Sequence, residues 1–293
     1  MEIPNFIFQA TENLVERPWG GEWISLLKGF RKKGIGESWE FSAHPSNPSQ
    51  VILKRKIAKL TELFVEAKKE ILGDLTEKHT AFPLLVKIID VSGRFDLHVH
   101  PSAKVAENFG ESEKEKQKAW IMLGGTAFIG FSENLTQEKF EEILSDEKQI
   151  FEKMNKFDAG MYDTFIIPPG TLHSAENARM IEISSNSELS YKITDEKAKK
   201  AVRLEKIGDF EIKGKRGKVE TDFFTAEVVE VAGKLDFSIK TFNLLLCLEG
   251  YAVLRSEKEV ADLQKGYSCL VPAFVGNYSI QSERAKVLRI IPK

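Results

Sequence analysis

The sequence predicts a mainly β protein built from two jelly-roll β-barrels, with helical insertions in its N-terminal half. Short runs rich in β-branched and aromatic residues recur along the 293-residue chain, separated by turn residues, and this pattern is typical of antiparallel strands. From about Asp209 the runs are joined by glycine-containing turns, and no histidine follows His173. We therefore expect a catalytic barrel with the insertions over residues 1–208, and a degenerate barrel without ligand residues over residues 209–293.

The first third of the chain is predicted to combine strands with one helix. The pair Gly20-Gly21 indicates a turn ahead of residues 23–27, which we expect to form a strand. Residues 36–45 alternate well enough for a strand that ends at its proline. Residues 60–72 carry apolar side chains at helical spacing, and Gly73 follows them as a stop signal.

The middle of the chain carries two further helical patterns and most of the strand patterns. We expect helices over residues 103–109 and from Thr136 onward, where apolar residues recur on one face. The expected strands are residues 82–91, 120–131, 164–168 and 180–185. Pairing between strands so distant in sequence would close a barrel.

Two histidine motifs stand on this strand framework. His98 and His100 are one residue apart in the stretch Arg94-Phe-Asp-Leu-His-Val-His-Pro101, so on a strand both imidazoles project from the same face. A tight turn in Pro168-Pro-Gly-Thr-Leu-His173 delivers a third imidazole from a strand edge. Three imidazoles that converge inside a barrel form a competent site for zinc or another divalent metal. The alternative is that all three are buried structural histidines.

The composition excludes several classes of protein. Lys and Arg number 42 against 44 Asp and Glu, which gives a formal net charge of −2 and no electrostatic reason to bind nucleic acid or an anionic membrane. The longest aliphatic run, Leu244 to Leu248, is far too short to span a bilayer, and the first residues lack a secretion signal. We expect a cytoplasmic monomer or homodimer in which Cys247 and Cys269 are reduced core thiols.

Six pieces of sequence, in one order along the chain, carry a resemblance to a known family. They are Trp19-Gly-Gly21, Gly36-Glu-Ser-Trp39, the run from Phe82 to Asp90, His98-Val-His-Pro101, the segment from Asp163 to His173, and the segment from Glu182 to Ser187. With these pieces the chain resembles the type I phosphomannose isomerases, metal-dependent cupins that interconvert mannose 6-phosphate and fructose 6-phosphate. The resemblance implies a double cupin fold and a zinc or other divalent transition-metal cofactor.

The resemblance also implies a set of metal ligands, with one departure. His100 and His173 match the family, and His98 stands where the family has glutamine. Lys118 stands where the family has a glutamate ligand, and its ammonium would oppose a bound dication by roughly 4 kcal/mol per pair of unit charges ~4 Å apart. Lys118 must turn away, lose its proton or be offset, and is a candidate for binding substrate. The carboxylates of Glu113 and Glu115 are candidates for a replacement ligand.

The remaining site residues follow from the resemblance in the same way. Glu182 is the candidate base that moves a proton between C1 and C2, or else it only orients Lys116, the candidate electrophile. Lys192 stands at a family arginine and is expected in the catalytic set. Asp96 is expected near the substrate, where it would disfavour a phosphate unless a cation pairs with it. Trp39 is a candidate floor for a sugar, with core packing as the alternative.

We therefore expect a mannose-6-phosphate isomerase that works by metal-assisted proton transfer through a cis-enediol. Two alternatives stay open at this point. One is an isomerase of an unphosphorylated sugar, which Asp96 would favour, and the other is a non-catalytic cupin that binds a sugar. All three take a small-molecule partner.

Overall fold

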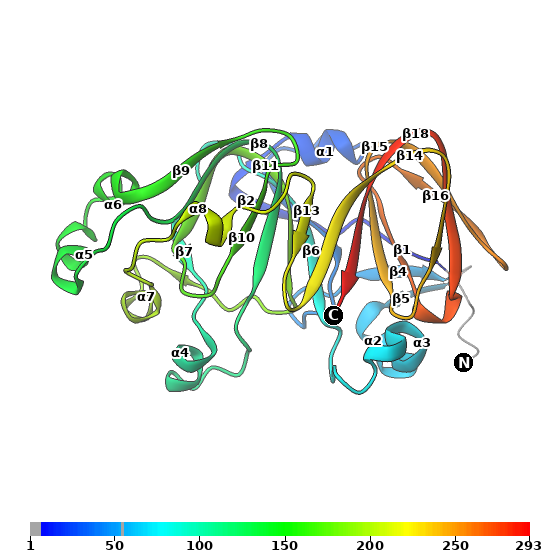
Figure 1. Ribbon diagram of the computed structural model, residues 1–293, viewed down its shortest axis with the longest axis horizontal. Helices are drawn as coiled ribbons and strands as arrows, with labels where there is room; N and C mark the ends of the chain where they lie inside the picture. The colour runs from blue at the N-terminus through cyan, green and yellow to red at the C-terminus, as the bar shows by residue number, and fades with distance from the viewer. Residues whose placement is uncertain (1–6, 54–55) are drawn as a thin grey trace.

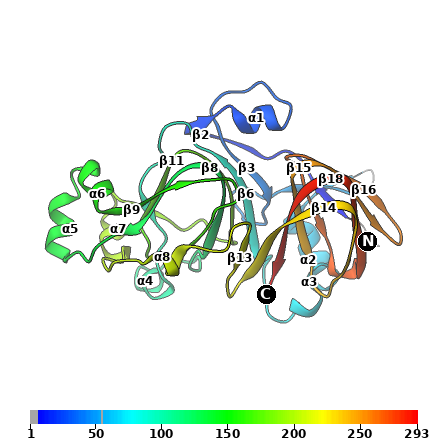
Figure 2. The ribbon, with the colours of Figure 1, turned by 45° about the horizontal axis from the view of Figure 1, so that its top comes forward.

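The protein consists of two curled antiparallel sheets that lie side by side (Figure 1). The computed structural model describes residues 7–53 and 56–293. One sheet lies beside the helices α5, α6 and α7, and the other contains the long C-terminal strands (Figure 2). The mainly β cupin architecture expected from the sequence is confirmed.

The first sheet contains both histidine motifs. Its strands run in the order β10-β8-β11-β6-β3-β2, with β9 on β8, and β7 between β11 and β12. Their bounds are β2 (Leu14–Gly21), β3 (Ile35–Phe41), β6 (Leu84–Asp90), β7 (His98–Val99), β8 (Lys118–Phe131), β9 (Met154–Ala159), β10 (Thr164–Ile167), β11 (His173–Ser185) and β12 (Tyr191–Lys192). Four of these, β6, β8, β10 and β11, confirm the strands expected in the middle of the chain.

The second sheet combines C-terminal strands with three short strands from the N-terminal part of the chain. Its order is β13-β14-β18-β15-β17-β1-β4-β5, with β16 on β15. The bounds are β1 (Phe8–Ala10), β4 (Gln50–Leu53), β5 (Lys56–Lys59), β13 (Lys218–Glu220), β14 (Phe224–Ser238), β15 (Asn243–Ser256), β16 (Val260–Gln264), β17 (Ser268–Val271) and β18 (Asn277–Pro292). Because β1 pairs with β17, the beginning of the chain completes the C-terminal sheet. The domain division at residue 208 stays a prediction.

Short helices connect the strands. They are α1 (Trp23–Leu27), α2 (Leu60–Glu66), α3 (Lys68–Leu72), α4 (Ala103–Asn108), α5 (Gln137–Ile143), α6 (Glu147–Lys153), α7 (Glu196–Ala201) and α8 (Asp209–Ile212), with 3₁₀ turns at Gly73–Leu75 and Ala273–Val275. The helices expected at residues 103–109 and after Thr136 are confirmed. The Thr136 hydroxyl caps α5 by accepting a hydrogen bond from the backbone N–H of Lys139.

One element differs from the prediction. Residues 23–27 form the helix α1, so the strand expected there is wrong. The Asp90 carboxylate accepts a hydrogen bond from the backbone N–H of Trp23 at 2.7 Å, in the first turn of the helix. Ile24 and Lys28 are buried while Leu26 is 65% exposed, which is helical rather than alternating burial. A partner distant in sequence therefore decides the conformation of this short segment.

The two sheets share one apolar core. Phe82, before β6, stacks on Phe242, before β15, with ring centroids 5.1 Å apart, and both side chains are fully buried. A buried ion pair joins Lys28 to Glu40 at 2.8 Å, and Glu40 also accepts a hydrogen bond from Ser268 of β17. These contacts hold the first sheet, and the site that it carries, against the second.

The structure bears on the expected state of the two cysteines and on the expected lack of a membrane-spanning segment. Cys247 and Cys269 are both free and buried, which confirms that they are core thiols. Within residues 7–53 and 56–293, we find no helix with the length and apolar character that crossing a membrane requires.

Candidate active site

The three histidines of the two motifs converge at one end of the first sheet. His98 lies on β7 and pairs in register with His173, the first residue of β11. Ring centroids are 4.1 Å apart for His98 and His173, 5.2 Å for His98 and His100, and 5.1 Å for His100 and His173. One nitrogen from each ring lies within 4.8 Å of the others. The predicted convergence is confirmed.

Backbone carbonyls determine which nitrogen of each ring faces the cluster. The Nδ1 atoms of His98, His100 and His173 lie 3.0, 2.7 and 2.7 Å from carbonyl oxygens. Those carbonyls belong to Asp96, Leu189 and Thr171. Because a carbonyl only accepts, each Nδ1 is the donor and each Nε2 keeps a free lone pair. The Nε2 atoms of His100 and His173 are buried without a hydrogen-bond partner, as expected of nitrogens placed to bind a metal ion.

The surroundings keep the three imidazoles neutral. Burial and, after it, the ammonium of Lys118 lower the pKa of His98 to about 3. Burial and then Lys118 also hold the pKa values of His100 and His173 well below the ordinary value for histidine. Neutral imidazole is the form that binds a metal. The donor set therefore fits a divalent transition metal.

An interruption of strand alternation brings Glu182 to the same side of the sheet as His173. Side chains of a regular strand alternate between its two faces, so His173 and Glu182, nine residues apart, would lie on opposite faces. The register of β11 against β8 is irregular between residues 176 and 180, opposite Gly124-Gly125. Contacts of Trp120 show that Glu182 and His173 lie on one side of the sheet. Its Nε1 donates a hydrogen bond to Glu182 at 2.9 Å, and its ring centroid lies 5.6 Å from that of His173.

A row of alternating charges leads from the histidines toward the surface. Glu182 lies between two lysines, with Lys116 Nζ 3.0 Å from one carboxylate oxygen and Lys118 Nζ 3.0 Å from the other. The row continues through Lys116–Glu188 at 2.5 Å, Glu188–Lys87 at 2.7 Å, Lys87–Glu37 at 3.5 Å and Glu37–Arg17 at 3.0 Å. The side chains of Lys87, Lys116, Lys118 and Glu182 are at most 5% exposed. Each buried charge is thereby paired, as burial requires.

The pKa values of the two lysines on Glu182 are shifted in opposite directions. Burial by itself lowers the pKa of Lys116, but Glu182 and Glu188 outweigh it and raise that pKa above its ordinary value. Burial lowers the pKa of Lys118 to about 8, opposed by Glu182 and reinforced by Lys116. For Glu182, burial raises the pKa, but Lys116 and Lys118 outweigh it and hold the pKa well below the ordinary value.

Comparison with known proteins identifies the family. Residues 25–120 match the model for the phosphomannose isomerase type I catalytic domain, and residues 207–292 match that for the mannose-6-phosphate isomerase cupin domain. A solved structure from Archaeoglobus fulgidus, provisionally described as a mannosephosphate isomerase, is 48% identical with a TM-score of 0.96, and covers 100% of this chain and 99% of that one. The chain belongs to the type I phosphomannose isomerase family.

Two more distant proteins that are named mannose-6-phosphate isomerase match over nearly the same length. The mannose-6-phosphate isomerase of Streptococcus mutans is 25% identical over 299 residues, which is 90% of this chain and 92% of that protein. A zinc-bound mannose 6-phosphate isomerase structure has a TM-score of 0.82 at 14% identity, and covers 98% of this chain and 99% of that one. The latter likeness concerns the fold.

The lysine that replaces the expected family glutamate is offset by a carboxylate. Lys118 is 2% exposed and bonds to Glu182. The candidate replacement ligands have other partners: Glu113 accepts from Ser187 and from the backbone of residue 188, and Glu115 accepts from the backbone N–H of residue 103. In the described ranges, the group able to hold a metal consists of the three histidines alone.

Three further residues expected in the type I phosphomannose isomerase site lie around this centre. Asp96 and Lys192 form an ion pair of 2.7 Å, with side chains 63% and 66% exposed. Lys192 lies opposite His98 in the pairing of β12 with β7, so the pair stands at the rim of the site. Trp39 is 3% exposed, with Lys87 Nζ 4.0 Å from its ring centroid. This burial supports the packing interpretation of Trp39.

Sequence reasoning missed the outer half of the charge row. Lys87 is the one charged residue in the otherwise apolar run Leu84–Ile89, and a buried charge inside a strand is a signal of a polar partner. Glu37 sits in an alternating strand and Glu188 in a loop, and neither has a comparable signal. Only the folded structure shows that both carboxylates meet Lys87, Glu37 at 3.5 Å and Glu188 at 2.7 Å.

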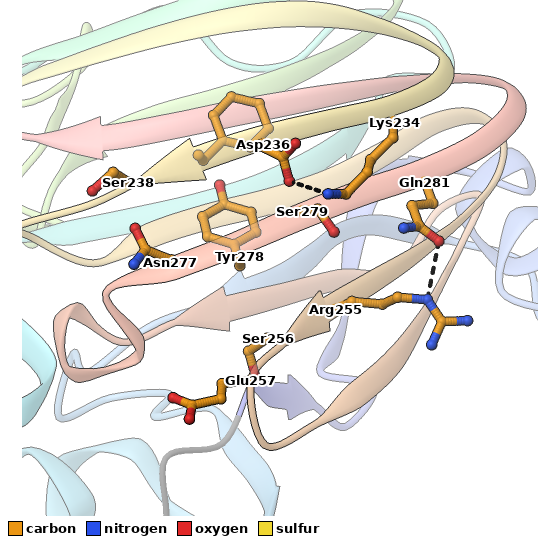
Figure 3. A pocket seen from close by; sticks show the side chains of 11 residues that line it. Lys234, Asp236, Ser238, Arg255, Ser256, Glu257, Asn277, Tyr278, Ser279 and Gln281 are labelled. Atoms are coloured by element: carbon orange, nitrogen blue, oxygen red, sulfur yellow. Dashed lines mark hydrogen bonds and ion pairs between the residues drawn. The ribbon is translucent and has the colours of Figure 1, made fainter.

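A separate cleft of about 600 Å³ lies on the second sheet, between β14, β15 and β18 (Figure 3). Lys234 forms an ion pair with Asp236 at 2.7 Å, and the Nε of Arg255 donates a hydrogen bond to the amide oxygen of Gln281 at 3.0 Å. It contains none of the three histidines. The group of histidines able to hold a metal ion therefore lies on the first sheet, away from this cleft.

Replacing His173 with alanine should remove the metal. We expect wild-type protein purified without added metal to contain close to one equivalent of a divalent transition metal, because three neutral imidazoles converge. His173→Ala should retain less than about a tenth of it. Elemental analysis measures this, and His79→Ala is the matched control because His79 lies outside the cluster. Wild-type protein purified without any bound metal would contradict the prediction that the three histidines form a metal site.

Glu188 should make the stability of the protein depend on pH in acid. Burial raises its pKa, but Lys116 and Lys87 outweigh this and lower the pKa to about 2. Its contribution is therefore complete above the ordinary value of 4.5 and is lost as the pH falls through about 2. Glu188→Gln should lower the free energy of unfolding at pH 7 by about 2 to 3 kcal/mol and flatten its decline in acid.

Urea unfolding at a series of pH values measures this effect. The exposed Glu257 provides the control, since Glu257→Gln should leave the curve within about 0.5 kcal/mol of wild type. Equal curves for Glu188→Gln and wild type would show that the row of charges does not act as described.

Proposed function

We propose that the protein is a mannose-6-phosphate isomerase, which interconverts mannose 6-phosphate and fructose 6-phosphate by moving a proton between C1 and C2. The observation that carries the proposal is the convergence of three neutral imidazoles beside the buried Lys116–Glu182–Lys118 cluster. Membership of the type I phosphomannose isomerase family supports the choice of substrate.

We propose zinc, or another divalent transition metal, as the ion held by His98, His100 and His173. Three imidazoles with one position left open are typical of catalytic zinc sites, and a zinc-bound protein shares the fold. When bound, such an ion supplies Lewis acidity toward the oxygens of the sugar. The hydrogen bonds from the three Nδ1 atoms to backbone carbonyls hold the rings in the required orientation.

The charged cluster beside the histidines provides a fixed electrostatic environment for an oxyanion. Lys116 keeps its proton because two carboxylates raise its pKa, so it is suited to stabilise the negative charge that develops on oxygen during enolisation. Glu182 accepts from Lys116, Lys118 and Trp120, and these donors hold its pKa low. Of the two roles left open for Glu182, its contacts support the orientation of the lysines.

The rim of the site bears on whether the sugar is phosphorylated. Lys192 is the exposed cation expected to meet a phosphate, since an ammonium can bind it as a point charge. The ion pair with Asp96 occupies Lys192 and favours the second candidate function, an isomerase of an unphosphorylated sugar. The family assignment outweighs this, because an exposed ion pair contributes only about 0 to 1 kcal/mol and is readily exchanged for a phosphate dianion.

A comparison of two sugars tests the proposed function. With zinc supplied, we expect kcat/KM for mannose 6-phosphate to exceed that for mannose by at least about tenfold, since a charge-assisted contact is worth ~1.5 to 3 kcal/mol. A coupled assay of product formation measures both. A higher value for mannose would favour the second candidate. Binding of either sugar without turnover would indicate a non-catalytic cupin.

Removing the charge of Asp96 should improve the use of the phosphorylated sugar. In Asp96→Asn the Lys192 ammonium is free to bind phosphate, so KM for mannose 6-phosphate should fall about threefold to tenfold while KM for mannose stays unchanged. Steady-state kinetics with both sugars measures the difference. Lys192→Met should raise KM for the phosphorylated sugar only. Equal changes for the two sugars would place the pair away from the phosphate.

A further inference from the structure

Lys118 is the cation that faces the three histidines most directly. After burial, its charge is the largest influence that lowers the pKa of His98, of His100 and of His173. Its Nζ lies 5.1 Å from the Trp120 ring centroid, which in turn lies 5.6 Å from the ring centroid of His173. The amine, held by Glu182 at 3.0 Å, therefore lies at the end of the charge row that is nearest to the histidine cluster.

The two lysines beside Glu182 have environments that separate their functions. Lys116 is paired with Glu182 and with Glu188, at 3.0 and 2.5 Å. Lys118 has Glu182 alone, at 3.0 Å, and shares it with Lys116. The two carboxylates raise the pKa of Lys116, whereas burial, opposed only by the shared Glu182, lowers the pKa of Lys118 to about 8. When the surroundings shift the pKa values of two neighbouring groups apart, the two groups are suited to different acid and base roles.

We propose that Lys118 is the catalytic residue that carries the proton between C1 and C2 of the sugar, with Glu182 as the positioning residue that holds its amine. This inference rests on the proposed isomerase activity. The family resemblance implies a glutamate metal ligand at position 118, and the inference gives a catalytic role to the lysine that stands there.

The proton transfer balances without any co-reactant. The neutral amine of Lys118 takes the hydrogen on C2 of the open-chain aldose. The electrons of the C2–H bond form the C1–C2 double bond, and the carbonyl pair moves to O1. The proton of the O2 hydroxyl passes to O1. The ammonium of Lys118 then returns its proton to C1, C2–O2 becomes the carbonyl of the ketose, and the amine is restored. Lys116 faces the same cluster as a constant positive charge.

Three substitutions of Lys118 separate this role from an electrostatic one. Lys118→Met keeps most of the volume without the amine, and Lys118→Arg keeps the charge but cannot lose a proton at working pH. Both should lower kcat for mannose 6-phosphate by about 10² to 10⁴, with KM within about threefold of wild type. In Lys118→Ala, added ethylamine should restore turnover at least about tenfold in a saturable manner.

A matched control and two further readouts separate chemistry from damage to the fold. Lys286→Met removes a partly buried lysine with a carboxylate partner, Glu249, on the second sheet, and should leave kcat unchanged and unaffected by ethylamine. Elemental analysis should find the wild-type content of divalent metal in each Lys118 variant. In D₂O, proton NMR should show slower exchange of the C2 hydrogen of the sugar by Lys118→Met than by wild type.

The outcomes separate this inference from the proposed function. Wild-type protein that does not interconvert the two sugar phosphates would overturn the proposed function itself. If wild type is active and Lys118→Arg keeps more than a tenth of kcat, the proton carrier is another group, because a guanidinium can still hold Glu182. Absence of rescue by ethylamine in a folded, metal-containing Lys118→Ala protein would overturn the inference as well.

Discussion

The site depends on one carboxylate shared between two ammonium groups. Glu182 bonds to Lys116 and to Lys118, each at 3.0 Å, and accepts a further hydrogen bond from Trp120 at 2.9 Å. Without it, two buried lysines would face three histidines with no charge between them, and burial of unpaired charge costs several kcal/mol per ion. The carboxylate lets a lysine occupy a place beside the imidazoles, and it sets the direction of both amines.

The position of Glu182 follows from the irregular middle of β11. Its register is interrupted between residues 176 and 180, opposite two glycines of β8 with positive φ. At Gly125 a side chain would meet Ala178 at about 2.4 Å, so only glycine fits the close approach of the strands there. The interruption lets one strand deliver both a histidine at its start and a carboxylate nine residues later to the same side.

The row of charges and the shared apolar core hold the neighbouring strands in place around β11. Glu188 links Lys116 to Lys87, so the row of charges continues from β11 to β6 and on to β3. The apolar core shared with the second sheet, including the stack of Phe82 on Phe242, fixes the segment that enters β6. Buried pairs of this kind add little net stability but are costly to break, so they act mainly by fixing geometry for the chemistry.

The sequence by itself determined the class of fold, the three histidines and most of the strands and helices. These follow from local properties: alternation of apolar residues, the spacing of His98 and His100 on one strand face, and the cap at Thr136. Tertiary structure alone decided that residues 23–27 form a helix, that Lys118 is offset by Glu182, and that Glu188 and Lys87 belong to the site. Each of these depends on strand register and on partners distant in the chain, for which no local pattern exists.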